Sequence, residues 1–381
     1  MLKKSYGLVY TEIVKIFEPL ILESGEVLPS YEIAYETYGR LDLEGKNAIL
    51  ICHGRSGNAH AAGHHESMST NGWWDNMIGP GKAFDTRKFF VISTNILGGC
   101  GGSTGPSSIN PDTGDPYGTS FPIITIKDMV NAQRKLLEYL GIKELFAVAG
   151  GSIGGMQVLQ WTVSYPKMIR KAIVIACTAS TTPQQIAIDF AARKSITSDP
   201  NWNEGDYYRG QKPIDGLAQA YMFSHIADLS DRSMYDKFGR SLHNKKELSY
   251  DLTVDFQVED YLNRQALDFA ERFDPNSFIY VTKAMDYFDL TGGGSLKIGL
   301  ETVEASVLVI SVTSDWLFPS YQGKRIVEAL AENGVDVQYG EILSDYGHDA
   351  FLVEGKQLTF LVNRFLSHPS WDGKRRDEDG P

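Results

Sequence analysis

Short runs of consecutive apolar residues, each bounded by turn-forming residues, constrain the fold of this 381-residue chain more than any other feature. Runs that are apolar throughout, without polar alternation, are typical of strands buried on both faces, as in a parallel sheet covered by helices. Residues 128–140 carry apolar side chains at helical spacing and are followed by Gly141, a common helix stop signal. Strand, helix and strand thus alternate, which predicts an α/β fold with a mostly parallel central sheet. The predicted strands are residues 48–52, 89–93, 145–149, 172–176 and 307–310.

After Cys177 the chain lacks a strand pattern for more than a hundred residues and becomes charged and rich in tyrosine and phenylalanine. Residues 260–273 and 276–288 place aromatic side chains at helical spacing. Strand and helix signals resume at residue 307, so we interpret the segment as a helical cap inserted into the sheet domain; an independent helical domain is the alternative. The predicted boundaries are a core of residues 1–178 and 300–368, a cap or lid of residues 179–299 and a polar tail of residues 369–381.

Composition excludes several classes of partner. The 36 Lys and Arg residues against 48 Asp and Glu give a net charge of -12, which repels nucleic-acid phosphates and anionic lipid. We therefore expect no nucleic acid and no membrane as partner. No apolar run approaches the ~18 residues of a membrane-spanning helix, and no secretion signal is visible. The three cysteines, Cys52, Cys100 and Cys177, form no CxxC pair, which favours a cytoplasmic location and argues against structural zinc.

The run Gly150-Gly151-Ser152-Ile153-Gly154-Gly155 follows a predicted strand and precedes a helical pattern over residues 156–165. It fits G-x-S-x-G, the nucleophile elbow, in which the serine occupies a strained strand-to-helix turn. A serine hydroxyl is a poor nucleophile, so it needs a histidine base and a carboxylate that orients the histidine. Asp315 and His348 follow in the order typical of α/β-hydrolases. We therefore predict the catalytic triad Ser152, Asp315 and His348.

An oxyanion hole needs two backbone N–H donors, which we assign to Ile153, after the nucleophile, and to Arg55, in the turn after the first predicted strand. Nearby, His60, His64 and His65 have no companion carboxylate pattern. We therefore predict no metal site.

Together with these residues, several longer motifs resemble the homoserine O-acetyltransferase family of the α/β-hydrolase superfamily. The resemblance runs from about residue 28 to residue 366. Its motifs include Tyr35-Glu36-Thr37-Tyr38-Gly39, Ser56-Gly57-Asn58-Ala59-His60, Gly105-Pro106-Ser107-Ser108-Ile109-Asn110-Pro111, Arg272-Phe273-Asp274 and Asp286-Tyr287-Phe288.

The resemblance implies an α/β-hydrolase fold with an inserted helical cap and an enzyme of methionine biosynthesis. Ser152 would be acylated by acetyl-CoA or another acyl-CoA as cosubstrate, His348 would relay protons, and Asp315 would orient it. The acyl group would pass to the hydroxyl of homoserine or a similar small acceptor. No tightly bound cofactor is implied, and members are typically homodimers whose caps meet over the active-site tunnel.

The chain also departs from the family at the acceptor site. The family arginine that clamps the substrate carboxylate aligns with Tyr221, and the tyrosine that assists it aligns with Asp228. Asp349, which meets the substrate's amino end in the family, is retained. Arg55 stands where the family tends to be apolar; it either supplies a replacement cation or points to solvent, and Arg193 is a further candidate.

Two functions therefore follow from the sequence. The first is O-acyl transfer from an acyl-CoA to a small hydroxylated acceptor. The second is a short-chain carboxylesterase that uses water as the acceptor, because the acyl-enzyme is common to both reactions. A catalytically inactive binding protein is disfavoured, because all three triad positions are filled.

Overall fold

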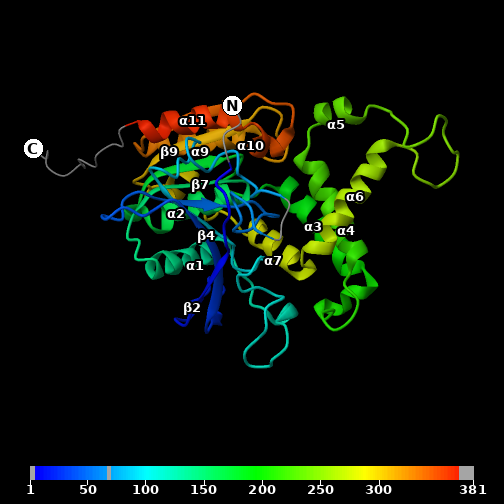
Figure 1. Ribbon diagram of the computed structural model, residues 1–381, viewed down its shortest axis with the longest axis horizontal. Helices are drawn as coiled ribbons and strands as arrows, with labels where there is room; N and C mark the ends of the chain where they lie inside the picture. Colours follow the sequence, from blue (N-terminus) through cyan, green and yellow to red (C-terminus); the bar gives the residue numbers. More distant parts are fainter. Residues whose placement is uncertain (1–4, 67–69, 369–381) are drawn as a thin grey trace, which may run out of the picture.

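An eight-stranded sheet forms the centre of the computed structural model, which describes residues 5–66 and 70–368 (Figure 1). The strand order is β1-β4-β6-β5-β7-β8-β9-β10. Strand β4 pairs antiparallel with β1 and β6, whereas all the other neighbours pair parallel, which confirms the predicted mostly parallel sheet. The strands are β1 (Glu12–Ile16), β4 (Tyr31–Tyr38), β5 (Ala48–Cys52), β6 (Phe90–Thr94), β7 (Leu145–Gly151), β8 (Ile169–Ile175), β9 (Ser306–Val312) and β10 (Val337–Ile342). A small separate hairpin joins β2 (Leu20–Ile21) to β3 (Val27–Leu28).

Helices cover both faces of this sheet, which explains why the central strands are apolar throughout. In β5, Leu50 belongs to the apolar cluster formed with α1 (Ile126–Tyr139), α2 (Ile153–Ser164) and α9 (Ser320–Glu332). Its neighbours Ile49 and Ile51 belong to the opposite cluster, with α11 (Gly355–Ser367) and residues 74–84. Successive side chains of a strand point to opposite faces, so both sets are buried.

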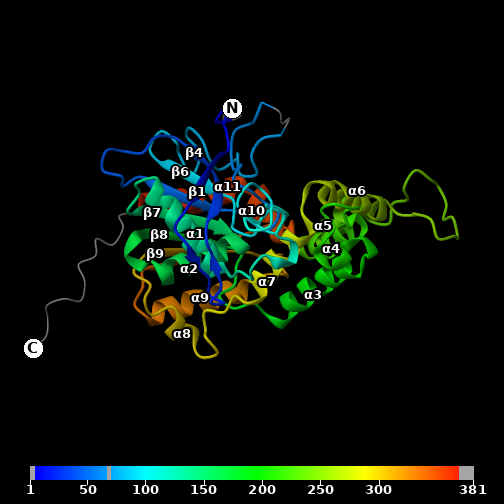
Figure 2. The same ribbon diagram turned by 90° about the horizontal axis from the view of Figure 1, so that it is seen from below.

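The segment between β8 and β9 contains helices and, in the part of the chain that the structure describes, no sheet strand. Its helices are α3 (Pro183–Ser198), α4 (Ile214–Asp228), α5 (Asp231–Phe238), α6 (Gln257–Arg272), α7 (Pro275–Asp286) and α8 (Leu296–Gly299). Figures 1 and 2 show α3 to α6 grouped to one side of the sheet, with α7 between them and the sheet.

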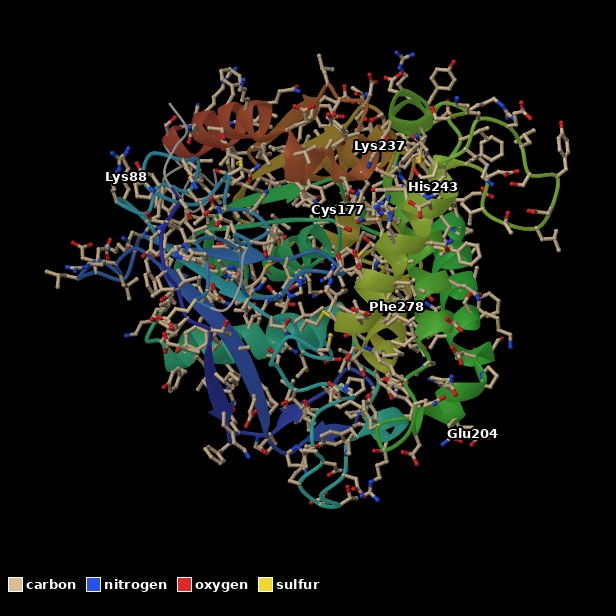
Figure 3. All side chains as sticks on the ribbon, turned by 45° about the vertical axis from the view of Figure 1, so that its right-hand side comes forward. Lys88, Cys177, Glu204, Lys237, His243 and Phe278 are labelled. Carbon is tan, nitrogen blue, oxygen red and sulfur yellow. The ribbon has the colours of Figure 1, made fainter. Side chains whose placement is uncertain are left out.

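Helix α7 connects two apolar cores. Its residues Tyr280, Val281 and Met285 pack into the core beside the sheet. Phe278 of the same helix packs instead with Phe269 of α6 and with residues of α3 and α4, and Figure 3 shows it at this boundary. The predicted helices 260–273 and 276–288 correspond to α6 and α7, each displaced by one to three residues.

Local capping explains some of the element boundaries. Thr125 caps α1 by accepting from the Asp128 N–H, and Asp128 accepts from the Thr125 N–H in return, so the helix begins two residues before the predicted start at residue 128. No helix among residues 5–66 and 70–368 is long and apolar enough to cross a membrane. The predicted polar tail, residues 369–381, lies outside the described residues.

Candidate active site

Ser152 occupies the sharp turn between β7 and α2. Its backbone angles are φ 60° and ψ -130°, a conformation that costs energy for a residue with a side chain. The turn also brings the chain against β5, since a Cβ atom at Gly150 would lie 2.7 Å from the carbonyl oxygen of Cys52. A Cβ at Gly154 would collide with the same carbonyl. The glycines are therefore a steric requirement of the turn that presents Ser152.

His348 and Asp315 form a buried hydrogen-bonded pair. The distance from His348 Nδ1 to Asp315 Oδ2 is 2.7 Å. Asp315 Oδ1 accepts from the backbone N–H groups of Leu317, at 2.9 Å, and Phe318, at 2.8 Å. Asp315 follows β9, and His348 lies in the short turn Gly347–Asp349 after β10, so adjacent parallel strands deliver both residues to one edge of the sheet.

This pairing adapts His348 to proton transfer. Burial, the largest single influence, favours the neutral ring, but the charge and hydrogen bond of Asp315 outweigh it and raise the pKa of His348 above 6.5. Nδ1–H donates to Asp315, which leaves Nε2 as the proton acceptor. Nε2 has no hydrogen-bond partner among the described residues.

Ser152 and His348 line the same cavity, which has a volume of about 330 Å³. The loop after β5 and residues 70–73 contribute to its wall, as do α4 and the end of α6. The lining residues are Gly54, Arg55, Ser56, Gly57, Asn58, His60, Thr70, Asn71, Trp73, Ser152, Asp228, Arg272, Met285, Leu317, His348, Asp349, Phe351 and Leu352.

Arg55 lines this cavity and does not point to solvent; its role as a replacement cation stays a prediction. Its Nη2 lies 3.4 Å from Asp228 Oδ2 and its Nη1 lies 3.9 Å from Asp189 Oδ1. Both distances exceed those of strong charge-assisted hydrogen bonds, so the guanidinium keeps donors for a ligand. The Arg55 side chain is only 12% exposed. Arg193, the other candidate, forms a buried ion pair with Asp286.

Two further carboxyl groups of this region have raised pKa values. Burial and the nearby charge of Asp228 raise the pKa of Asp349 to about 7. Burial also raises the pKa of Asp189 to about 7, although Arg55 acts in the opposite direction. Both groups therefore change charge close to neutral pH.

Of the four predicted substrate-binding residues, the structure brings Arg55, Asp228 and Asp349 together on the cavity wall. Tyr221 is not among the residues that line the cavity and stacks on Phe269, with ring centroids 4.3 Å apart. Burial, with smaller effects from Asp228 and Asp349, raises its pKa to about 12. Tyr221 is thus a packing residue in this structure.

The predicted oxyanion donors lie on the two segments that meet at Ser152. Ile153 is the first residue of α2, where helical N–H groups lack intrahelical acceptors. Arg55 lies in a turn closed by a 3.0 Å hydrogen bond from Gly57 N–H to Gly54 O. Within the described residues, neither the Ile153 nor the Arg55 N–H donates a hydrogen bond. Both are thus available to a ligand oxygen.

His53 holds this turn in place. Its Nδ1 lies 2.6 Å from Gly54 O, and its Nε2 accepts from the Ile96 N–H at 3.1 Å. Burial lowers the pKa of His53 to about 4, so the ring is neutral and structural.

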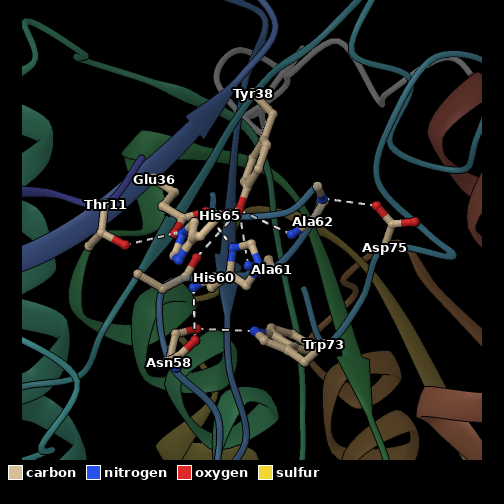
Figure 4. A network of polar contacts seen from close by, with 12 residues as sticks. Thr11, Glu36, Tyr38, Asn58, His60, Ala61, Ala62, His65, Trp73 and Asp75 are labelled. Atoms are coloured by element: carbon tan, nitrogen blue, oxygen red, sulfur yellow. Dashed lines mark hydrogen bonds and ion pairs between the residues drawn. The ribbon is translucent and has the colours of Figure 1, made fainter. Parts of the chain in front are cut away.

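A second carboxylate–imidazole cluster lies beside the cavity (Figure 4). Glu36 accepts from His60 Nδ1 at 3.1 Å, His65 Nε2 at 2.8 Å, Tyr38 at 2.6 Å and Thr11 at 2.8 Å. Two imidazoles and a carboxylate are a possible donor set for a divalent metal ion. However, four hydrogen bonds already occupy both carboxylate oxygens, which favours a hydrogen-bonded cluster.

The sequence analysis missed two residues of this region. Glu36 is the companion carboxylate that the histidine pattern lacked; its strand also contains Glu32 and Thr37, so the strand pattern did not single it out. Asp189 of α3 reaches Arg55 only because α3 packs on α4, and its sequence position carries no such signal.

Comparisons with known proteins agree with this fold. A family model described as alpha/beta hydrolase fold matches residues 47–355. The homoserine O-acetyltransferase of Methanohalobium evestigatum is 59% identical over 365 residues, which cover 96% of this chain and 75% of the relative. This chain therefore spans about three quarters of that relative's length.

Solved structures extend the similarity. The crystal structure of homoserine O-acetyltransferase from Bacillus anthracis matches with a TM-score of 0.90 and 33% identity, covering 95% of this chain and 99% of that one. Esterase E22 matches with a TM-score of 0.87 and 31% identity, covering 94% and 100%. The resemblance and fold class predicted from the sequence are thereby confirmed, and the chain belongs to the homoserine O-acetyltransferase family, a group of O-acyltransferases with the α/β-hydrolase fold.

Proposed function

We propose that this protein transfers an acetyl or other short acyl group from an acyl-CoA to the hydroxyl group of homoserine or a closely similar small amino acid. Ser152 is the nucleophile, His348 the general base and acid, and Asp315 the group that orients His348. The proposal is supported by the name of the relatives and by the position of Ser152 and His348 in one cavity.

The first half-reaction acylates the enzyme. His348 Nε2 takes the Ser152 proton while Oγ attacks the thioester carbonyl, and the resulting oxyanion is stabilised by the N–H groups of Ile153 and Arg55. Collapse of this intermediate breaks the C–S bond. The departing CoA sulfur takes the proton from His348, which leaves acyl-Ser152 and free CoA.

The second half-reaction returns the enzyme to its starting state. His348 takes the proton of the acceptor hydroxyl, whose oxygen attacks the acyl-serine carbonyl. The bond to Ser152 Oγ then breaks, and the proton passes from His348 to Oγ. The charged Asp315 stabilises the imidazolium that forms in each half-reaction.

One observation carries the choice of acceptor. The cavity of Ser152 also presents Arg55 and Asp349, groups of opposite charge. An amino acid carries a carboxylate and an ammonium group, which complement these two residues. Water needs neither. A cation on the loop after β5 thus replaces the family arginine that aligns with Tyr221.

The experiment follows release of the CoA thiol from acetyl-CoA with and without L-homoserine, together with intact-protein mass spectrometry. Thiol release should depend on homoserine, and without it the protein should gain about 42 Da, one acetyl group on the nucleophile. The Ser152→Ala variant should show neither. Persistence of the adduct in that variant would overturn the nucleophile assignment, and thiol release independent of homoserine would overturn the acceptor assignment.

A second candidate function is a short-chain carboxylesterase with water as the acceptor. The similarity to esterase E22 favours it, because that protein shares the fold over 94% of this chain. Hydrolysis of p-nitrophenyl acetate measured beside transfer to homoserine distinguishes the two. An esterase would hydrolyse p-nitrophenyl acetate rapidly, and its rate of acetyl transfer to homoserine would not exceed its rate of hydrolysis.

The quaternary structure stays a prediction from the family resemblance. We propose a homodimer with small-molecule substrates and no tightly bound cofactor. Sedimentation velocity on the full chain tests whether it is a homodimer.

A further inference from the structure

His60 is a second histidine of the cavity wall for which the proposed reaction has no role. It lines the cavity that holds Ser152 and His348. Its side chain is 7% exposed, and its Nε2 atom has no hydrogen-bond partner among the described residues. Buried polar atoms are rarely left unpaired, so this nitrogen calls for a partner that the protein itself does not supply.

Glu36 determines what kind of partner that is. Burial, the largest single influence, raises the pKa of Glu36, but hydrogen bonds from His60, Tyr38, Thr11 and His65 outweigh it and lower the pKa below its usual value. An ionised carboxylate can only accept hydrogen bonds, so His60 Nδ1 carries the proton that it donates to Glu36. In a neutral ring, Nε2 is then an acceptor. The arrangement has the same form as Asp315 and His348, in which the carboxylate holds Nδ1–H and leaves Nε2 without a partner among the described residues.

Apart from Glu36 behind it, the residues that line the cavity next to His60 are polar but uncharged. The His60 backbone N–H donates to Asn58 Oδ1 at 2.9 Å, and the Trp73 indole N–H donates to Asn58 O at 3.0 Å. Thr70 and Asn71 line the same cavity next to Trp73. Figure 4 shows Asn58, His60 and Trp73 together around the Glu36 cluster.

The charged residues Arg55, Asp228 and Asp349 of the cavity wall form a second group, connected by their own contacts. Arg55 contacts Asp228, and Asp228 and Arg55 both influence the pKa of Asp349. The cavity thus has one charged set of residues and one uncharged hydrogen-bonding set. A charged ligand would bind at the charged set, and an uncharged ligand with amide groups would bind at the uncharged set.

We infer that the uncharged set binds the arm of the acyl-CoA donor, with His60 Nε2 accepting a hydrogen bond from an amide N–H of that arm. This inference rests on the proposed function. The arm that carries the thioester is a neutral chain with two amide groups, which offers N–H donors and no charge. The amino-acid acceptor is a zwitterion and complements Arg55 and Asp349 instead. Asn58 and Asn71 can pair with the amide carbonyls.

The test measures acetyl-CoA binding by calorimetry in a Ser152→Ala background, in which no turnover occurs. His60→Asn keeps an N–H donor near the position of Nδ1, and so the contact with Glu36, but removes the acceptor at Nε2. The expected result is a Kd for acetyl-CoA that rises roughly 2- to 12-fold, the range for one neutral hydrogen bond. The Kd for L-homoserine should change less than the Kd for acetyl-CoA.

His65→Gln is the matched control, because His65 contacts the same carboxylate through Nε2 but is not among the residues that line the cavity. The Kd of this variant for acetyl-CoA should lie within about twofold of that of the Ser152→Ala protein, since no contact with acetyl-CoA is removed. His60→Gln is a second variant that places an amide oxygen near the position of Nε2, and it should bind better than His60→Asn. Equal Kd values for the His60→Asn and His65→Gln variants would overturn the inference, as would a loss confined to homoserine.

This design separates the inference from the proposed function. If the Ser152→Ala protein with His60 intact does not bind acetyl-CoA, the assignment of acyl-CoA as donor is wrong, and the inference falls with it. If that protein binds acetyl-CoA and the His60→Asn change has no effect, only the inference is wrong.

Discussion

Replacing Arg55 tests whether the cation of the loop after β5 holds the carboxylate of the acceptor. Arg55→Met removes the guanidinium but keeps a long apolar side chain against Phe278, whose ring centroid lies 5.6 Å from the Arg55 Cζ. The backbone N–H, which we propose as an oxyanion donor, is unchanged. The variant therefore separates binding of the acceptor from stabilisation of the oxyanion.

The magnitude follows from the contacts of Arg55. Its contacts with Asp228 and Asp189, at 3.4 Å and 3.9 Å, are long, so most of its N–H donors are available to a substrate. A hydrogen bond to a charged group contributes about 1.5–3 kcal/mol, which corresponds to a loss of roughly 10- to 150-fold in kcat/KM for homoserine. Arg55 lowers the pKa of Asp189, so without Arg55 the Asp189 carboxyl group should be protonated at neutral pH. The variant should therefore fold, because no unpaired buried charge is left at Asp189.

The assay compares kcat/KM for transfer to homoserine with kcat/KM for p-nitrophenyl acetate, which has no carboxylate. Arg55→Met should impair the first reaction far more than the second. Arg272→Met is the matched control, because Arg272 lines the same cavity and packs on the Phe269 ring at 5.2 Å. If Arg272→Met carries the loss, or if both reactions of Arg55→Met fall equally, Arg55 does not hold the carboxylate.

The remaining predictions concern protonation and the cap. Since the pKa of His348 is raised above 6.5, kcat/KM should fall as pH drops through a value above 6.5, and Asp315→Asn should move this limb to lower pH; a pH–rate profile flat to about pH 5 would contradict a histidine base. Asp349 loses its charge below about pH 7, so the KM for homoserine should rise there while the KM for acetyl-CoA, measured as the control, does not follow. If Arg55 binds the carboxylate, Tyr221→Arg combined with Asp228→Tyr should not improve transfer to homoserine; a gain of tenfold or more, the low end for a charge-assisted contact, would show that the cap position is still the carboxylate site.

The central strands could be predicted from sequence because burial on both faces leaves an unbroken apolar run. All five residues of β5 are buried, and its predicted bounds match those of the structure. Strand β1 lies at the sheet edge, and only two of its five residues are buried, so polar and apolar residues mix as they do in loops. Strand β10, at the other edge, is mostly half-buried and was missed for the same reason.

The residues of the proposed site likewise fall into those that the sequence predicts and those that it does not. Ser152 and Asp315 could be predicted because each follows a recognisable buried strand, and the parallel sheet brings strand ends to one edge. His348 follows the missed strand β10, so its prediction rested on the order of the triad residues along the chain. The partners of Arg55 could not, because Asp189 and Asp228 lie on different cap helices. Their approach depends on how α3 and α4 pack, which no local pattern encodes.

The residues at positions 221 and 228, where the chain departs from the family, have a consistent physical explanation in this packing. Tyr221 stacks on Phe269 and lies 5.4 Å, centroid to centroid, from His225, so the position of the family arginine has become part of an aromatic cluster. In our proposal Arg55 supplies the cation instead, and Asp228, where the family has a tyrosine, lies beside it. A second arginine at position 221 would give up the stacking and introduce a positive charge near Arg55, since Arg55 already influences the pKa of Tyr221. The substitutions therefore depend on one another, and reverting one position alone should lower stability before it can improve binding of the acceptor.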